Sequence, residues 1–342
     1  MNMDFERKLA IPMEVKEMYP ITMEISTRIK ERSLELKKIM DRKDDRLILI
    51  IGPCSADYEA SVLDYVTRLK KVSDEVKDKI FIIPRVFTNK PRTTGQGYKG
   101  LLHQPDPDKK PDLFKGIIAT RELHMKVVTE TGFISADEML YPENHKYLDD
   151  LLGYVSVGAR SVEDQQHRLT ASGIEVPVGM KNPTGGDFNA MLNSIRAAQT
   201  PHSFIYRGWA AHSLGNEYAH AIVRGYTDFS GKNISNYDYE HMVKLNEMYM
   251  ASELLNPAVI IDTNHANSGK DPFKQPDIID EVLAYREKNA DLKSLIRGFM
   301  VESYIEDGKQ PVGGGVYGKS ITDACLGWEK TEKLIKTIAD RI

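Results

Sequence analysis

The sequence predicts an α/β fold, a closed (β/α)8 TIM barrel with an N-terminal helical extension. The chain has 342 residues, a length typical of such a barrel with an addition. Short apolar runs rich in β-branched residues alternate with longer amphipathic stretches from Leu47 onward, which is typical of βα units around a parallel sheet. There are eight such runs, which favours a closed barrel, although counting alone also fits an open doubly wound sheet.

The first segment, residues 1–44, is charged and its later part has helical periodicity. Apolar residues recur there at roughly helical spacing, at Ile25, Ile29, Leu34, Leu36 and Ile39. We therefore predict two parts of the chain. Residues 1–44 form a helical extension available for contacts between subunits, and residues 45–342 form the barrel.

The eight predicted strands follow in order along the barrel part. Each is an apolar run bounded by polar residues, glycine or proline. They cover residues 46–52, 80–87, 132–139, 155–160, 176–182, 220–225, 258–266 and 297–303. The stretches between them leave room for the crossover helices that parallel strands require.

A polar or ionisable residue stands at the end of every predicted strand. In chain order these residues are Cys54, Arg85, Glu138, Arg160, Lys181, Arg224, His265 and Glu302. One such residue is unremarkable, because a chain that leaves a sheet meets water. Eight in succession point to the mouth of a barrel, where barrel enzymes place their active sites.

Four of these strand ends carry positive charge although the chain has a net charge of −4. Arg85, Arg160, Lys181 and Arg224 are joined by a nearby loop, "TNKPRTTGQGYKG", that contributes Lys90, Arg92 and Lys99. Crowded cations repel one another unless anions lie among them. Arginine and lysine side chains suit phosphate and carboxylate groups, so the pattern predicts substrates with several such groups.

A second set of residues has the chemistry of a metal site. Cys54, His265 and Glu302, with Asp323 from "GKSITDACLGW", offer a thiolate, an imidazole and two carboxylates, a plausible shell for a divalent transition metal. Strands one, seven and eight become neighbours when a barrel closes. A catalytic Cys–His pair is the alternative, but it requires an oxyanion hole that the sequence does not identify.

The composition disfavours several classes of partner. Acidic net charge and the lack of long basic runs argue against nucleic acid or an anionic membrane surface. No run of 18 apolar residues occurs, and the two cysteines do not form a disulfide framework. We expect a protein of the reducing cytoplasm.

Two glycine-rich motifs match nucleotide-binding patterns without the required context. "GGGVYGKS", residues 313–320, fits a P-loop, but it follows "YIEDGKQPV" instead of a strand. "GQGYKG", residues 95–100, fits a dinucleotide-binding fingerprint, but three prolines follow where its helix should run. Neither motif predicts a nucleotide site.

Several segments together resemble the type I 3-deoxy-D-arabino-heptulosonate-7-phosphate (DAHP) synthases, also called phospho-2-dehydro-3-deoxyheptonate aldolases. They are "IGPCS", "KPRTT", "GAR", "PVGMKN", "IVRG", "DTNHANS", "MVES" and "YGKSITDACLGWE". The resemblance extends from about Asp44 to the C-terminal end and implies a (β/α)8 barrel. It also implies a transferase that condenses phosphoenolpyruvate with D-erythrose 4-phosphate, the first step of the shikimate pathway, and a homodimer or homotetramer.

The resemblance also implies roles for individual residues. It assigns the divalent metal to Cys54, His265, Glu302 and Asp323, with Mn²⁺ favoured and Fe²⁺, Co²⁺ or Zn²⁺ as alternatives. It assigns phosphoenolpyruvate to Arg85, Lys99, Arg160, Lys181, Arg224 and His265, and the aldose phosphate to Lys90, Pro91, Arg92 and Thr93. Glu138 is expected among the substrate-binding residues as well. Catalytic roles fall on Lys90, His265, Cys54 and Asp323.

The sequence departs from the resemblance in two places. The loop "TTGQGYKG" is one residue longer than the family form, which affects the placing of Lys99. The segment 201–225 is shorter than in aromatic-inhibited members, and Glu175 replaces a small hydroxyl residue. Because a buried charge opposes an apolar effector, we expect weak or absent inhibition by phenylalanine and tyrosine.

Two alternative functions remain at this point. One is a related 3-deoxy-octulosonate-8-phosphate synthase that uses arabinose 5-phosphate. The other is a non-catalytic barrel that only binds phosphorylated metabolites. The "KPRTT" segment favours the four-carbon sugar phosphate, and the four proposed metal ligands favour catalysis.

Overall fold

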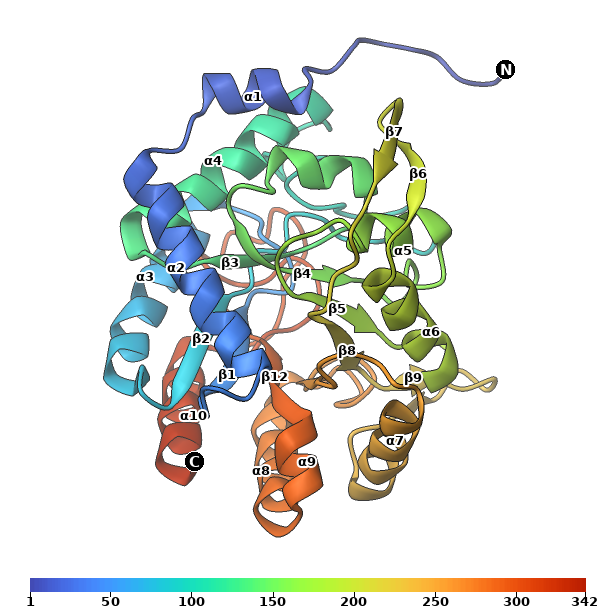
Figure 1. Ribbon diagram of the computed structural model, residues 1–342. Helices are drawn as coiled ribbons and strands as arrows, with labels where there is room; N and C mark the ends of the chain where they lie inside the picture. The colour runs from blue at the N-terminus through green and yellow to red at the C-terminus, as the bar shows by residue number, and fades with distance from the viewer.

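A computed structural model describes residues 1–342, which form a barrel of eight parallel strands surrounded by helices (Figure 1). The barrel strands are β1 (Leu47–Gly52), β2 (Ile80–Pro84), β3 (Ser135–Glu138), β4 (Leu152–Val157), β5 (Val178–Lys181), β8 (Ala219–Val223), β11 (Val259–Asp262) and β12 (Ile296–Glu302). The predicted fold class is confirmed, and each predicted strand overlaps one of these eight.

The strands pair in the order β2-β1-β12-β11-β8-β5-β4-β3, all of them parallel. The remaining gap between β2 and β3 is closed by a parallel bridge between Arg85 and Ala136, where the Val86 N–H donates to the Ala136 carbonyl at 2.9 Å. First and last strands in the chain, β1 and β12, are therefore neighbours, as the proposed metal site requires.

Helices cover the outside of the barrel. They are α3 (Glu59–Val76), α4 (Leu113–Thr131), α5 (Gln165–Ala171), α6 (Phe188–Gln199), α7 (Tyr239–Ala251), α8 (Gln275–Lys288), α9 (Ala290–Leu295) and α10 (Trp328–Arg341), with short 3-10 helices η1 (Pro142–Tyr147) and η2 (Pro272–Lys274). Several start at an aspartate cap: Asp112, Asp164 and Asp238 each accept a hydrogen bond from a backbone N–H of the first turn.

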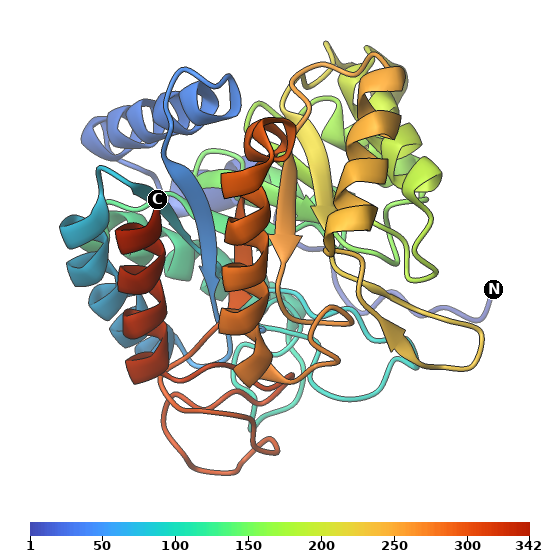
Figure 2. The same cartoon turned by 90° about the horizontal axis from the view of Figure 1, so that it is seen from below.

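The extension contributes α1 (Pro12–Met18) and α2 (Met23–Met40). The apolar face of α2 joins the main core, with Leu36, Ile39 and Met40 fully buried. The Arg297 guanidinium at the start of β12 donates to the Ile39 carbonyl at 2.8 Å. Helix α2 therefore covers the N-terminal ends of the strands, away from the loops gathered at the other end (Figure 2).

Two small antiparallel hairpins were not predicted. They are β6 (Ser203–Tyr206) with β7 (Trp209–His212), and β9 (Tyr226–Thr227) with β10 (Asn233–Ile234). Both lie outside the barrel sheet.

The two glycine-rich motifs lie in loops. Residues 95–100 belong to the segment between β2 and α4, and residues 313–320 belong to the segment between β12 and α10. No helix is both long enough and apolar enough to span a bilayer.

Candidate active site and metal centre

Cys54 lies directly after β1 because the strand ends at Gly52-Pro53. A side chain at Gly52 is excluded, since a Cβ there would lie 2.3 Å from the Arg85 carbonyl oxygen. Only 1% of Cys54 is exposed, and its sulfur lies 3.6 Å from Asp323 Oδ2. Close approach of β1 to the Arg85 backbone thus fixes where the thiol enters the mouth.

Lys90 lies between the thiol and the carboxylate. Its ammonium is 2.8 Å from both Cys54 Sγ and Asp323 Oδ2. Burial, followed by the charge of Glu302, raises the pKa of the Cys54 thiol to about 11. Burial also raises the pKa of Asp323, but Lys90 outweighs this effect and holds that pKa well below its usual range. The three groups therefore form a compact cluster of a thiol, an ammonium and an ionised carboxylate.

Glu302 ends β12 and is held by two partners. Its Oε1 accepts from Arg85 Nη2 at 3.0 Å, and its Oε2 accepts from Asn264 Nδ2 at 2.6 Å. Arg85 also donates to the Pro53 carbonyl. These bonds fix the carboxylate while it is 1% exposed.

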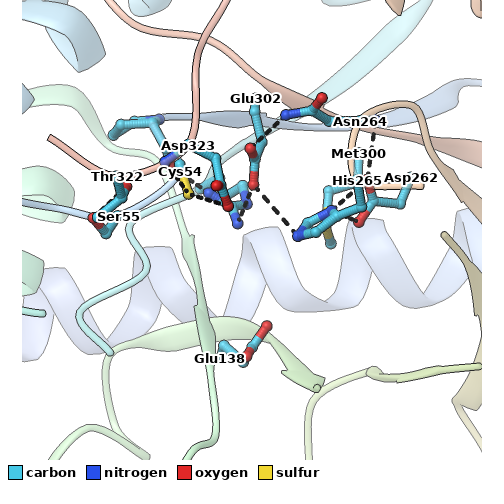
Figure 3. Close-up of polar contacts among 12 residues, drawn as sticks. Cys54, Ser55, Glu138, Asp262, Asn264, His265, Met300, Glu302, Thr322 and Asp323 are labelled. Atoms are coloured by element: carbon cyan, nitrogen blue, oxygen red, sulfur yellow. Dashed lines mark hydrogen bonds and ion pairs between the residues drawn. The ribbon is translucent and has the colours of Figure 1, made fainter. Parts of the chain in front are cut away.

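His265 approaches Glu302 from the other side (Figure 3). Its Nε2 lies 3.8 Å from Glu302 Oε1, and its Nδ1 lies 2.9 Å from Asp262 Oδ2. The residue has a φ of +48°, a left-handed conformation that is uncommon outside glycine. Strain at this position is consistent with a backbone shaped to direct the imidazole.

The donor atoms fit a divalent transition metal. Ligand atoms of Cys54, Glu302 and Asp323 all lie within 4.8 Å of one another. A thiolate with two carboxylates suits such an ion, and the imidazole of His265 lies at the edge of the same group. The cluster could therefore hold a metal, with three donors already gathered and the fourth adjacent.

A cationic cavity of about 250 Å³ opens beside this cluster. Of the predicted residues it is lined by Cys54, Arg85, Lys90, Pro91, Arg92, Thr93, Glu138, Arg160, Lys181, Arg224, His265 and Asp323. The cavity thus combines the donors that could bind a metal with residues that could bind anions.

The cations of the cavity differ in how they are neutralised. Lys181 Nζ lies 3.0 Å from Glu138 Oε2 and both side chains are buried. Burial raises the pKa of Glu138, but Lys181 outweighs this effect and lowers it. Arg224, in contrast, forms no ion pair, and burial lowers its pKa. Arg160 Nε donates to Thr93 Oγ1 at 2.9 Å. Arg224 and Arg160 thus remain available for an anionic ligand.

Lys99 is not brought to the cavity. It is exposed and does not line the mouth, because the loop around Gly97 and Gly100 folds back with Arg92 Nε on the Tyr98 carbonyl. The extra residue in this loop already indicated that the position of Lys99 differs from the one that the resemblance implies.

Sequence reasoning missed several supporting residues. Asp262 and Asn264 orient His265 and Glu302, and Lys270 and Asn89 line the cavity. The segment "DTNHANS" already contained the first two, at the end of a predicted strand. Lys270 lies in the loop after β11, where periodicity carries no information.

A larger cavity of about 770 Å³ lies between α2, η1 and the β6–β7 hairpin. Its lining includes Ile29, Phe204, Tyr206 and Ser213, together with Glu175. The expectation that Glu175 is buried is wrong: it is exposed, because it stands in the turn that precedes β5.

Comparisons with known proteins agree on one family. The sequence matches the model of the DAHP synthetase I family over residues 19–336. It is 36% identical to the Phe-sensitive phospho-2-dehydro-3-deoxyheptonate aldolase of Escherichia coli (strain K12), covering 98% of this chain and 95% of the relative. It is also 36% identical to the Tyr-sensitive enzyme of that strain, covering 97% and 93%.

The structure has a similar solved relative. It superposes on the phospho-2-dehydro-3-deoxyheptonate aldolase from Francisella tularensis SCHU S4 with a TM-score of 0.91 and 30% sequence identity. The match covers 100% of this chain and 98% of the other.

Proposed function

The chain belongs to the DAHP synthetase I family, and from this premise we propose how its barrel mouth performs the family's reaction. The protein condenses phosphoenolpyruvate with D-erythrose 4-phosphate to DAHP and inorganic phosphate, the first step of the shikimate pathway. The observation that carries the site assignment is the cationic cavity directly beside a thiol and two carboxylates.

Phosphoenolpyruvate carries a phosphate and a carboxylate, and the cavity offers a cation for each. Arg224 and Arg160 have no carboxylate partner, so they are free to bind the phosphate. Lys181 forms an ion pair with Glu138, and Arg85 forms an ion pair with Glu302. These pairs hold the cations in place and complete the anion site.

The sugar phosphate binds through the loop of Lys90, Pro91, Arg92 and Thr93, all of which line the cavity together with Arg160. As phosphoenolpyruvate C3 forms a bond to the aldehyde carbon, the aldehyde oxygen gains negative charge. Lys90 donates a proton to that oxygen, since its ammonium lies among Cys54 and Asp323 at the cavity wall.

The remaining charge develops at C2 of phosphoenolpyruvate. Water adds to C2 and loses a proton, and phosphate leaves with the electron pair of the C2–O bond. Arginine side chains around the phosphate stabilise the leaving group. His265 and Asp323 lie on either side of Glu302; we assign acceptance of the proton from water to His265, because Lys90 makes the Asp323 carboxylate a weak base.

A divalent ion held by Cys54, Glu302, Asp323 and His265 would act as a Lewis acid on the aldehyde oxygen. Mn²⁺ is the proposed ion, with Fe²⁺, Co²⁺ and Zn²⁺ as alternatives that this donor set also accepts. The assay that tests the assignment measures turnover before chelation, after chelation and after each metal is restored. Turnover that survives complete chelation would contradict it.

Substrate choice is tested with two sugars. We expect turnover with erythrose 4-phosphate and little with arabinose 5-phosphate, the substrate of the sister enzymes. Equal rates with both would contradict the assignment of the loop at Lys90 and Arg92.

We also propose weak or absent inhibition by phenylalanine and tyrosine, although curated relatives include Phe-sensitive and Tyr-sensitive enzymes. The support is that Glu175 contributes an exposed carboxylate to the lining of the 770 Å³ cavity, where it would lie against an apolar effector. An inhibition constant below the millimolar range for either amino acid would contradict this. A homodimer or homotetramer remains a proposal, to be measured by sedimentation.

A further inference from the structure

The base of the barrel, at the N-terminal ends of the strands, contains a separate cavity of about 480 Å³. It lies between the starts of β1 and β12, helices α8 and α9, and the end of α10. Figure 2 shows these helices on the same side of the barrel. Because all eight strands are parallel, this cavity and the mouth lie at opposite ends of the sheet.

Two arginines reach into this cavity without a carboxylate partner. Arg286 is 8% exposed and Arg297 is 5% exposed, and the Nε of each has no hydrogen-bond partner. Arg297 Nη2 donates only to backbone carbonyls, those of Ile39 at 2.8 Å and Asp44 at 3.1 Å. Buried, unpaired guanidinium groups are costly, so a fold that keeps two of them together calls for a counterion.

The surroundings add positive charge. The lining holds Arg42, Lys293 and Arg341 besides these two, against the acids Asp45 and Glu287. Glu287 is already engaged, because Arg341 Nε donates to its Oε1 at 2.8 Å. Asp280 also pairs with Arg341, and Asp45 and Asp44 lie near Arg297, so the cations of the lining are only partly neutralised and outnumber its acids.

The two buried arginines affect each other. Burial, followed by the charge of Arg297, lowers the pKa of Arg286 to about 10. Burial, followed by the charge of Arg42, lowers the pKa of Arg297. Asp45 and Asp44 oppose the shift of Arg297 without cancelling it, so burial and neighbouring cations outweigh the nearby acids at both arginines.

We propose that this base cavity binds a small phosphate-bearing anion, separate from the substrates at the mouth. Guanidinium groups present planar sets of donors that match phosphate oxygens. The volume is in the range of small-molecule sites, so it has room for the organic part of a phosphate ester as well as for phosphate itself. Buried Arg286 and Arg297 hold the phosphate, and exposed Lys293 lies at the rim.

The test uses inorganic phosphate as the probe and thermal unfolding as the readout. The parent protein is unfolded in rising phosphate and in potassium chloride of equal ionic strength. Phosphate binds at both ends of the barrel in the parent, so variants separate the two sites. Arg286→Gln removes the base site, Arg224→Gln weakens the mouth site, and Lys288→Gln removes an exposed charge of α8 that does not line the base cavity.

In chloride, Arg286→Gln should unfold at the same or a higher temperature than the parent, because an unpaired buried charge is lost. At a phosphate concentration ten times the Kd of the base site, phosphate should raise the unfolding temperature of Arg286→Gln by about 2 °C less than it raises that of the parent protein. Arg224→Gln and Lys288→Gln should keep the share of the phosphate-induced rise in unfolding temperature that comes from the base site. Turnover of Arg286→Gln should stay within about twofold of the parent, since the base is remote from the mouth.

Two results would overturn the inference. One is an equal phosphate gain in the parent and in Arg286→Gln. The other is an equal gain of the parent in phosphate and in matched chloride. If Arg286→Gln does not fold, Lys293→Gln at the exposed rim replaces it: its gain in phosphate should be smaller than that of Lys288→Gln, and an equal gain would overturn the inference.

Discussion

The mouth and the base of the barrel both bury cations, but they neutralise them differently. At the mouth, Arg85 lies beside Glu302 and Lys181 beside Glu138, with separations of 3.0 Å in both pairs. At the base, Arg297 contacts only backbone carbonyls, and Arg286 has no partner for its Nε. Where catalysis needs fixed geometry, carboxylates hold the cations; at the base, the charge is left open for a ligand.

The difference also separates two origins of charge in a barrel. The mouth charges stand at the ends of strands, so the sheet itself positions them. Of the base charges, only Arg297 belongs to a strand, at the start of β12; the others come from helices and from the chain before β1, so the group converges only when the outer helices have packed. Experiments that remove one partner at a time should therefore give opposite results at the two ends.

The largest expected effect is on Cys54. Cys54→Ser should lower metal-dependent turnover by at least about 100-fold, because a hydroxyl replaces the proposed thiolate ligand. The free energy of unfolding should change little, because the serine and cysteine side chains are similar in size. Metal content and turnover are measured together.

Cys325→Ser is the matched control for that substitution. Cys325 is also buried, and its sulfur accepts from the Cys54 N–H at 3.4 Å, but it does not line the mouth cavity. It should keep metal and turnover. Unchanged activity in Cys54→Ser would refute the proposed ligand role.

The next effect concerns a buried ion pair at the mouth. Glu138→Gln should lower the free energy of unfolding by about 3 kcal/mol, because Lys181 then lies buried with its nearest carboxylate, Asp262, 3.9 Å away. Chemical denaturation without substrates measures this. This is the opposite sign to Arg286→Gln at the base.

Glu59→Gln is the control for the loss of a carboxylate. Glu59 pairs with Lys126 on the surface, where both side chains are more than two-fifths exposed, so the loss should stay below about 1 kcal/mol. Equal losses of unfolding free energy in Glu138→Gln and Glu59→Gln would mean that burial does not make the Glu138–Lys181 pair more costly to break.

The smallest effect comes from the barrel interior between the two ends. His220 Nε2 lies 2.7 Å from the Tyr154 hydroxyl, and burial lowers the pKa of this histidine to about 4. The folded state therefore resists protonation that the unfolded chain accepts near pH 6.5. The contribution of neutral His220 to the free energy of unfolding is therefore present above pH 6.5 and is lost as the pH drops toward 4.

From pH 6.5 to 5.5 this histidine should account for about 1 kcal/mol of the fall in unfolding free energy. His220→Gln should remove that share, and the comparison isolates it from His145, whose pKa burial also lowers to about 4. Parallel pH curves for parent and variant would show that His220 does not titrate as described.

The barrel strands and the mouth could be predicted from the sequence because they share one geometry. A buried parallel strand is a continuous apolar run, and the next residue stands at the mouth, so Cys54, Arg85 and Glu302 were located by position alone. Lys99 shows the limit of this reasoning. It belongs to a glycine-rich loop whose path depends on bonds such as Arg92 to Tyr98, which no periodicity records.

The base cavity and the outer hairpins could not be predicted. Arg42, Arg286, Arg297 and Arg341 lie on four separate elements with no common motif. Strands β6 and β7 are mostly exposed, so they lack the apolar runs that marked the barrel. In both cases the information lies in how helices and loops pack, which a single sequence does not display.

The burial of α2 has a practical consequence for anyone who shortens the chain. A fragment that begins at residue 45 keeps all eight strands but loses Leu36, Ile39 and Met40, whose apolar side chains form the floor beneath them. Such a fragment would expose an apolar surface to water and would aggregate during expression, even though its catalytic residues are all present.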